Sequence, residues 1–94
     1  MGLTLVRVIQ ASLHRTLPGP TPQGTAPLIH DLLWAHATLA DGLEHIRPRP
    51  TEQGLDLFLF VRAHSDASAL QQMRTLLNRA DAPIAAHGFT VATP

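Results

Sequence analysis

The stretch LDLFLFVRAH, residues 55–64, is the most apolar run of the chain and decides how the fold is interpreted. In a β-strand, successive side chains point to opposite faces. One face of this stretch carries only aliphatic side chains: Leu55, Leu57, Leu59, Val61 and Ala63. The other face carries two aromatic rings among polar groups: Asp56, Phe58, Phe60, Arg62 and His64. The first face is typical of a core, and the second is either a second core face or a surface that binds something.

The order of elements around this strand predicts an α+β fold. Hydrophobic periodicity indicates strand, helix, strand, strand, helix and strand in turn. These elements are residues 3–14, 28–41, 44–54, 55–64, 65–80 and 88–93. Two βα units with a hairpin between them are typical of the ferredoxin-like (βαββαβ) plait. We therefore expect a four-stranded antiparallel sheet in the order 4-1-3-2, with both helices on one face.

Turn and capping residues fit this division. Thr25 is the expected N-cap of the first helix, and Gly42 is its expected left-handed C-cap. Ser65 or Asp66 is expected to cap the second helix. Between the first strand and the first helix lies a proline-rich loop, residues 15–27. In the second strand, Pro48 and Pro50 cannot donate to a neighbouring strand, which predicts an edge position.

Composition limits the function classes. The 94 residues predict a single domain, 1–94, with formal net charge zero, so no electrostatic attraction to nucleic acid or anionic lipid is expected. The absence of cysteine excludes disulfides and thiolate catalysis. The six histidines are scattered, which predicts no metal site and no cofactor. Without a signal-peptide pattern or a membrane-spanning run, we expect a cytoplasmic protein, and the lysine-free, Ala- and Leu-rich usage indicates a GC-rich, bacterial source.

In such a plait the helices cover one face of the sheet and leave the other open. The even-numbered residues of the two central strands should line the open face, where Val6, Val8, Phe58 and Phe60 form an apolar patch. Arg7 is a misfit, because it falls on the core side and must either reach outward or mark a bulge. We expect the patch, together with Trp34 on the outer side of the first helix, to be an interface.

A second group of residues predicts a ligand site. We take the central strands to be parallel neighbours, which would bring His14 and His64 together at their C-terminal ends, near Arg62. His36 lies in the apolar stripe of the first helix, where it is expected to be a core histidine or a buried base. His14, Arg62 and His64 would hold a small acidic ligand, and His36 is a further candidate ligand-binding residue.

Three functional hypotheses follow. The first is a non-enzymatic accessory or adaptor module that forms a homodimer through its open sheet face. The alternative is a small-molecule-binding domain or cofactor-free enzyme of the dimeric α/β-barrel type, with a pocket lined by His14, His36, Arg62 and His64. The third is an RNA-binding plait, because LFLFV at residues 57–61 resembles the aromatic strand of RNA-recognition domains. Asp56 stands where that motif has a basic residue, and the chain lacks the charge to bind phosphates.

Overall fold

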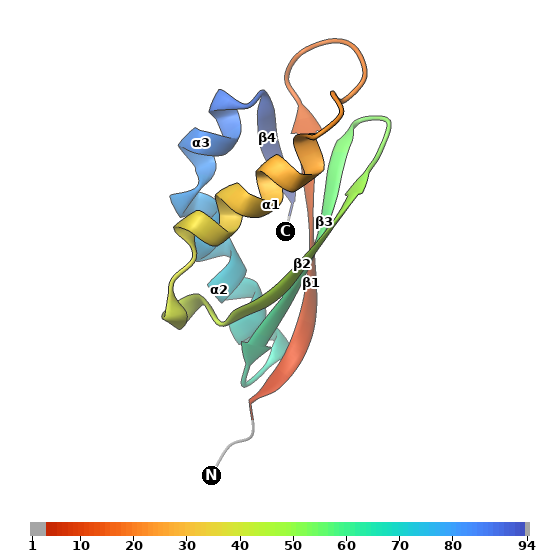
Figure 1. The fold of residues 1–94 in the computed structure, drawn as a ribbon. Coiled ribbons are helices and arrows are strands. Elements are labelled where there is room, and N and C mark those ends of the chain that lie inside the picture. Colours follow the sequence, from red (N-terminus) through yellow and green to blue (C-terminus); the bar gives the residue numbers. More distant parts are fainter. Residues whose placement is uncertain (1–3, 94) are drawn as a thin grey trace.

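The computed structural model describes residues 4–93 as one four-stranded sheet with its helices on one side (Figure 1). The elements are β1 Leu5–Arg15, α1 Thr25–His36, the 3-10 helix η1 Leu39–Asp41, β2 Leu43–Pro50, β3 Gly54–Ala63, α2 Asp66–Arg79, α3 Asp81–Ala86 and β4 Phe89–Thr93. This is an α+β architecture with two main helices, as predicted. Leu3, which the sequence places in the first strand, lies outside the described residues.

The sheet is antiparallel throughout, with the strand order β2-β3-β1-β4. Read from the other edge, this is the predicted order 4-1-3-2. The two central strands pair along almost their whole length, from Leu5 opposite Ala63 to His14 opposite Gly54. The expectation that they run parallel is therefore wrong. Helix α1 carries the chain past β3 to its far side, so β1 and β2 share one direction, and the hairpin turns β3 against both.

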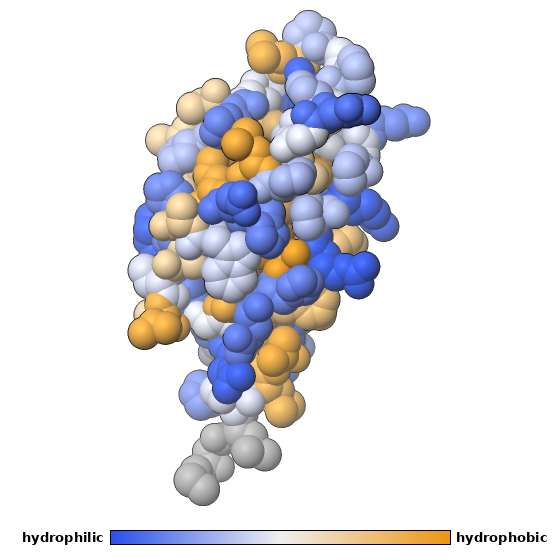
Figure 2. Space-filling view, viewed as in Figure 1, coloured by the Kyte–Doolittle hydropathy of each residue, from blue (hydrophilic) through white to orange (hydrophobic). Residues whose placement is uncertain are grey.

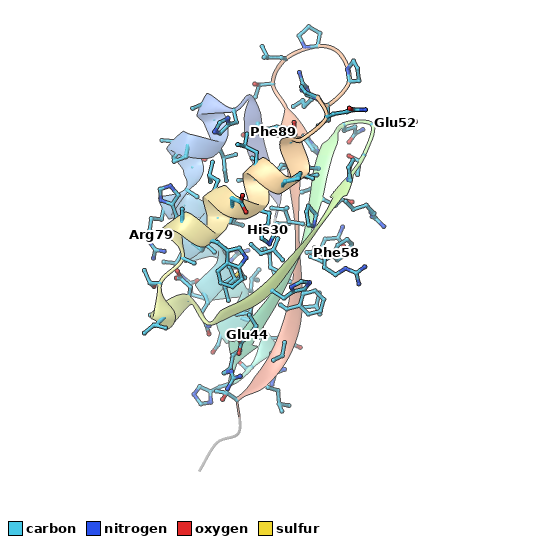
Figure 3. All side chains as sticks on the ribbon, viewed as in Figure 1. His30, Glu44, Glu52, Phe58, Arg79 and Phe89 are labelled. Atoms are coloured by element: carbon cyan, nitrogen blue, oxygen red, sulfur yellow. The ribbon has the colours of Figure 1, made fainter. Side chains whose placement is uncertain are left out.

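The core lies between the sheet and the helices. As predicted, the odd-numbered residues of β3 and of the second half of β1 point into it, and Phe89 of β4 joins them (Figure 3). The buried apolar side chains are Ala11, Leu13, Ile29, Leu33, Leu43, Ile46, Leu55, Leu57, Leu59, Val61, Ala63, Ala69, Met73, Leu76, Leu77, Ala80, Ile84 and Phe89. Together they form one hydrophobic cluster between the sheet and the helices.

The first helix is shifted relative to its prediction. It begins at Thr25, with the left-handed Gly24 as N-cap, so Thr25 is a helical residue and not the cap. It ends at His36, because the chain then turns into the short η1. Gly42 is left-handed at φ 68°, as expected, but it caps η1. Leu39 continues the apolar spacing of the helix in the sequence, but it lies beyond the end of α1 and is fully exposed.

The second half of the chain follows its prediction more closely. Ser65 caps α2, since its hydroxyl accepts a hydrogen bond from the amide of Ser68 at 3.0 Å. The short helix α3 was not predicted, because Pro83 suggests an interruption after the second helix. Pro83 occupies the third position of α3, in the first turn, where a missing amide hydrogen breaks no helical bond.

Arg7 lies on the core side of β1, and its side chain reaches outward to solvent. This is one of the two arrangements predicted for it, the other being a bulge. Its guanidinium passes the end of the sheet and donates to the carbonyls of Ala63 and His64, at 3.3 and 3.1 Å. It also pairs with Asp66, the first residue of α2, at 2.9 Å. The β1–β3 register continues through this position without a shift, so no bulge is involved.

Candidate functional site

The uncovered side of the sheet, called the open face below, carries side chains from three strands. Residues directly opposite each other on paired strands point to the same face. Val8 and His45 both lie opposite Phe60, while Gln10 and Arg47 lie opposite Phe58. The open face thus consists of Val6, Val8, Gln10, Ser12 and His14 from β1, His45, Arg47 and Arg49 from β2, and Asp56, Phe58, Phe60 and Arg62 from β3. Figure 3 shows Phe58 on the side of the sheet away from the helices.

The two phenylalanines form one wall of a shallow groove at the β2 edge. They line a hollow of about 420 Å³ together with Arg47, Pro48 and Arg49. The Arg49 guanidinium lies over the Phe58 ring, 5.2 Å from its centroid, in a cation–π contact. The His45 and Phe60 rings are 5.4 Å apart. Both aromatic rings are therefore half-buried by cationic or titratable neighbours from β2.

The valines of β1 are less protected. Val6 is 52% exposed and Val8 is 53% exposed, although both belong to β1, a central strand of the sheet. Large apolar side chains on a folded surface are ordinary singly, but a continuous patch usually marks an interface. The valines and the phenylalanines occupy neighbouring strands, so they form one continuous apolar strip.

Ion pairs organise the polar rim of the open face. Arg49 pairs with Asp56 at 2.9 Å, and the Ser12 hydroxyl donates to the same carboxylate at 3.1 Å. The hydrogen bond from Arg49, supported by that from Ser12, lowers the pKa of Asp56 despite its partial burial. Arg62 pairs with Glu44 at 2.6 Å. Within residues 4–93, Arg47 has no carboxylate partner, so it leaves a positive charge beside the groove.

The contribution of β2 to this face was not predicted from the sequence. His45, Arg47 and Arg49 alternate with the period of two that places them on one side of a strand. The HxRxR spacing could therefore have predicted that these three side chains share one face. The two prolines of the strand were used only to predict its edge position.

The predicted ligand residues do not meet. His14 lies opposite Gly54 at one end of β3, and His64 follows Ala63 at the other end. Ten residues of extended strand separate these positions by roughly 30 Å. The expected proximity of the two histidines is wrong, because it depended on a parallel arrangement. His14 instead borders a separate hollow at the β2–β3 hairpin, with Glu52 and Asp56 among its neighbours.

The other two predicted ligand residues also lie apart. Arg62 is held by Glu44 at the His64 end of the sheet. His36 is the last residue of α1 and is half-buried, so it is not the core histidine that was predicted. Its backbone carbonyl accepts a hydrogen bond from Arg79 at 2.9 Å. The four residues therefore share no pocket.

Trp34 occupies the outer side of α1, as predicted, and is 38% exposed. Its ring packs edge-on against His30, with the centroids 6.5 Å apart. It also borders a hollow of about 400 Å³ next to η1, where Leu39 protrudes into solvent. No residue of the proline-rich loop lines this hollow, so the loop does not cover Trp34.

Comparison with known proteins gives no relative from which residues can be transferred. No protein-family model, no curated protein and no solved structure matches the chain. Between residues 4 and 93, the structure has no helix long and apolar enough to cross a membrane. In that same part of the chain, no three His, Asp or Glu side chains are grouped so as to hold a metal ion. The functional interpretation accordingly starts from the open face.

Proposed function

We propose that the protein is a small interaction module that forms a homodimer by packing the open face of one copy against that of another. The observation that carries this proposal is the apolar strip of Val6, Val8, Phe58 and Phe60, on the sheet face that the helices leave uncovered. In this proposal the module is an accessory or adaptor protein, and Trp34 is the side chain offered to a further partner.

The composition of the face suits such a contact. Protein interfaces combine an apolar, often aromatic centre with a polar rim, and arginine is enriched in them. Here the valines and phenylalanines are the centre, and Arg47, Arg49 and Arg62 lie around them. Two of these arginines are already neutralised by Asp56 and Glu44, which lowers the electrostatic cost of bringing two identical faces together.

The small-molecule alternative has weaker support. A pocket between sheet and helices would have to open among the apolar core side chains that are packed there. The groove on the open face is lined by Arg47, Arg49 and the phenylalanines, and none of its lining residues is a histidine. A ligand in that groove would have to be a small anion with an apolar part, held without an evident acid or base for catalysis.

Three further predictions accompany the proposal. We infer that the fold is a ferredoxin-like plait, which the strand order and the two main helices support. A single domain over residues 1–94 and a cytoplasmic location are inferred from the sequence.

Sedimentation equilibrium at micromolar concentration tests the dimer. The open-face contact is expected to double the mass of the wild-type chain. Phe60→Asp is expected to lose this doubling, because the contact would bury two carboxylates whose desolvation costs free energy. Gln71→Asp is the matched control, since Gln71 is exposed on α2, away from the sheet, and should keep the dimer. A monomeric wild type, or a cooperatively folded Phe60→Asp chain of unchanged mass, contradicts the proposal.

A further inference from the structure

The two edges of the sheet differ in how they are protected. The β2 edge has Pro48 and Pro50, which carry no amide hydrogen, and the charged side chains of Arg47 and Arg49. Prolines and charges are the usual means by which proteins keep an edge strand from pairing with another chain. At the other edge, β4 is short and pairs only with residues 12–15 of β1. Residues 5–11 of β1 therefore pair with β3 on one side and, among residues 4–93, with no strand on the other.

The free side of this segment presents unpaired backbone groups. In an antiparallel sheet, the amide and carbonyl of successive residues point alternately to the two neighbouring strands. Arg15 donates its amide to Gln53 on the β3 side, and Thr16 donates to Gly88 on the β4 side, each at 2.9 Å. Because the β1–β3 register has no shift over residues 5–14, every even-numbered residue points to the β4 side. Val6, Val8 and Gln10 thus direct their amides and carbonyls to the free edge.

The opposite strand agrees with this assignment. Arg62, which lies across from Val6, donates its amide to Gly42 on the β2 side at 2.7 Å. Arg62 therefore directs its amide away from β1, as it must if Val6 also points away from β3.

The side chains of the free segment are mostly apolar and exposed. Leu5 is 56% exposed, close to the values for Val6 and Val8. In Figure 2, orange surface gathers at the end of the sheet next to the N-terminus, where β1 begins. The one charged residue, Arg7, is already paired with Asp66. The segment contains no proline and no bulge against β3, so this edge lacks the protection of the β2 edge.

We propose that a second copy of the chain fills this edge, with its own β1 antiparallel and Val8 opposite Val8 of the second copy. Two-fold symmetry requires the segment to be complementary to itself. The resulting opposite pairs are Val6 with Gln10, Arg7 with Ile9, and Leu5 with Ala11. None of these pairs opposes two like charges.

In the proposed pairing the two-fold axis passes at Val8, and an axis at either neighbouring residue would give a less favourable contact. An axis at Arg7 would place two arginine residues directly opposite each other, a pairing of like charges that is unfavourable. An axis at Ile9 would set Leu5 against Leu13, where β4 already occupies the edge. The zero net charge of the chain adds no general repulsion between copies.

This contact goes beyond the proposed open-face dimer and uses different atoms. It is made by backbone groups of the β1 edge, and it would join the two four-stranded sheets into one. The open faces of both copies would become one surface, in which the valines of the two β1 strands are adjacent. Face-to-face packing is neither required nor prevented by it.

Disulfide trapping tests the edge contact, since the chain has no cysteine of its own. Opposite residues in a hydrogen-bonded antiparallel pair have Cα atoms about 5.5 Å apart, within the range that a disulfide spans. Val8→Cys should therefore link two copies under mild oxidation. Val6→Cys is the matched control because it has the same exposure, strand and face. Across the proposed axis its two copies are about 14 Å apart, too far for a disulfide.

The expected result is that Val8→Cys links at least roughly tenfold faster than Val6→Cys, because only the former meets the distance requirement. An equimolar mixture of Val6→Cys and Gln10→Cys chains should also link, because these positions are opposite in the proposed register. Equal rates for Val8→Cys and Val6→Cys, or a mixture that links no faster than its components alone, would overturn the proposal.

The same experiment separates this proposal from the open-face dimer. Sheets packed face to face are about 10 Å apart, so that dimer alone would link neither variant. Val8→Cys combined with Phe60→Asp should still link if the edge contact exists. If Val8→Cys links no faster than Val6→Cys while Phe60→Asp lowers the mass, the edge proposal fails and the open-face dimer stands. If Phe60→Asp leaves the mass unchanged while Val8→Cys links faster than Val6→Cys, the open-face dimer fails and the edge proposal stands.

Discussion

Arg79, in the last turn of α2, lies with Nη1 2.8 Å from the carboxylate Oδ2 of Asp41 in η1. Asp41 is only 3% exposed, and its carboxylate also accepts a hydrogen bond from the Thr38 amide at 2.7 Å. Arg79 donates in addition to the carbonyl of His36, and Figure 3 shows it beside the end of α1. One ion pair thus joins the end of α1, the turn that leads into β2, and the end of α2.

Replacing Asp41 by Asn is expected to destabilise the protein. The substitution keeps the volume of the side chain but removes the charge that Arg79 and Thr38 bind, at a cost of about 1–3 kcal/mol. Urea unfolding followed by circular dichroism measures the change in the free energy of unfolding. Asp31→Asn is the control, because Asp31 is exposed on α1 and should change stability little. Equal stabilities of the two variants would show that the ion pair contributes nothing measurable.

We expect the Asp41 carboxylate to make the free energy of unfolding depend on pH in the acid range. Burial alone would raise the pKa of Asp41, but the hydrogen bonds from Arg79 and Thr38 outweigh it and lower the pKa below the usual 3.8. A lowered folded-state pKa stabilises the protein above the unfolded-state pKa, and this stabilisation is lost as pH falls through the folded-state value. We therefore expect the free energy of unfolding to decrease below about pH 4. Asp41→Asn should show a smaller decrease, and an unchanged acid dependence in that variant contradicts the assignment.

Alanine substitutions at two left-handed glycines allow the cost of backbone strain to be measured apart from the cost of steric overlap. Gly42 (φ 68°) and Gly24 (φ 85°) both have a backbone conformation that L side chains rarely adopt. A Cβ at Gly42 would lie 2.5 Å from the Arg62 carbonyl oxygen, whereas a Cβ at Gly24 would meet nothing within 4 Å. Gly24→Ala should cost about 1 kcal/mol of conformational strain, and Gly42→Ala should cost more because β3 must also move. Equal losses in thermal melts would mean that the overlap is relieved without cost.

The sequence predicts most strongly those features that depend on local periodicity. The alternation of Leu55 to Ala63 identifies the core face of β3, and the Ser65 cap locates the start of α2. Arg7 was recognised as a misfit because its position in an alternating strand is unambiguous. Each of these inferences needs only the residue and its neighbours in the chain.

The errors occur where a residue's position depends on distant parts of the chain. The direction of β1 relative to β3 follows from the crossover, and it separates His14 from His64 although both strands are assigned correctly. The apolar spacing of Leu39 and Ala40 continues the helical pattern, yet α1 ends at His36, and Asp41 of η1 pairs with the distant Arg79. The open face was predicted from two strands, while its cationic side comes from the third.

Trp34, the sole tryptophan of the chain, reports on which side of the sheet self-association occurs. It is 38% exposed on α1, and both proposed contacts between copies leave α1 free. The acrylamide quenching constant of its fluorescence is therefore expected to stay unchanged between nanomolar and tens of micromolar protein, while the mass increases. Phe60→Asp gives the value for a chain that lacks the open-face contact, and Trp34→Phe gives the background signal. A quenching constant that falls as the wild-type mass rises would place α1 in the interface and contradict association through the sheet alone.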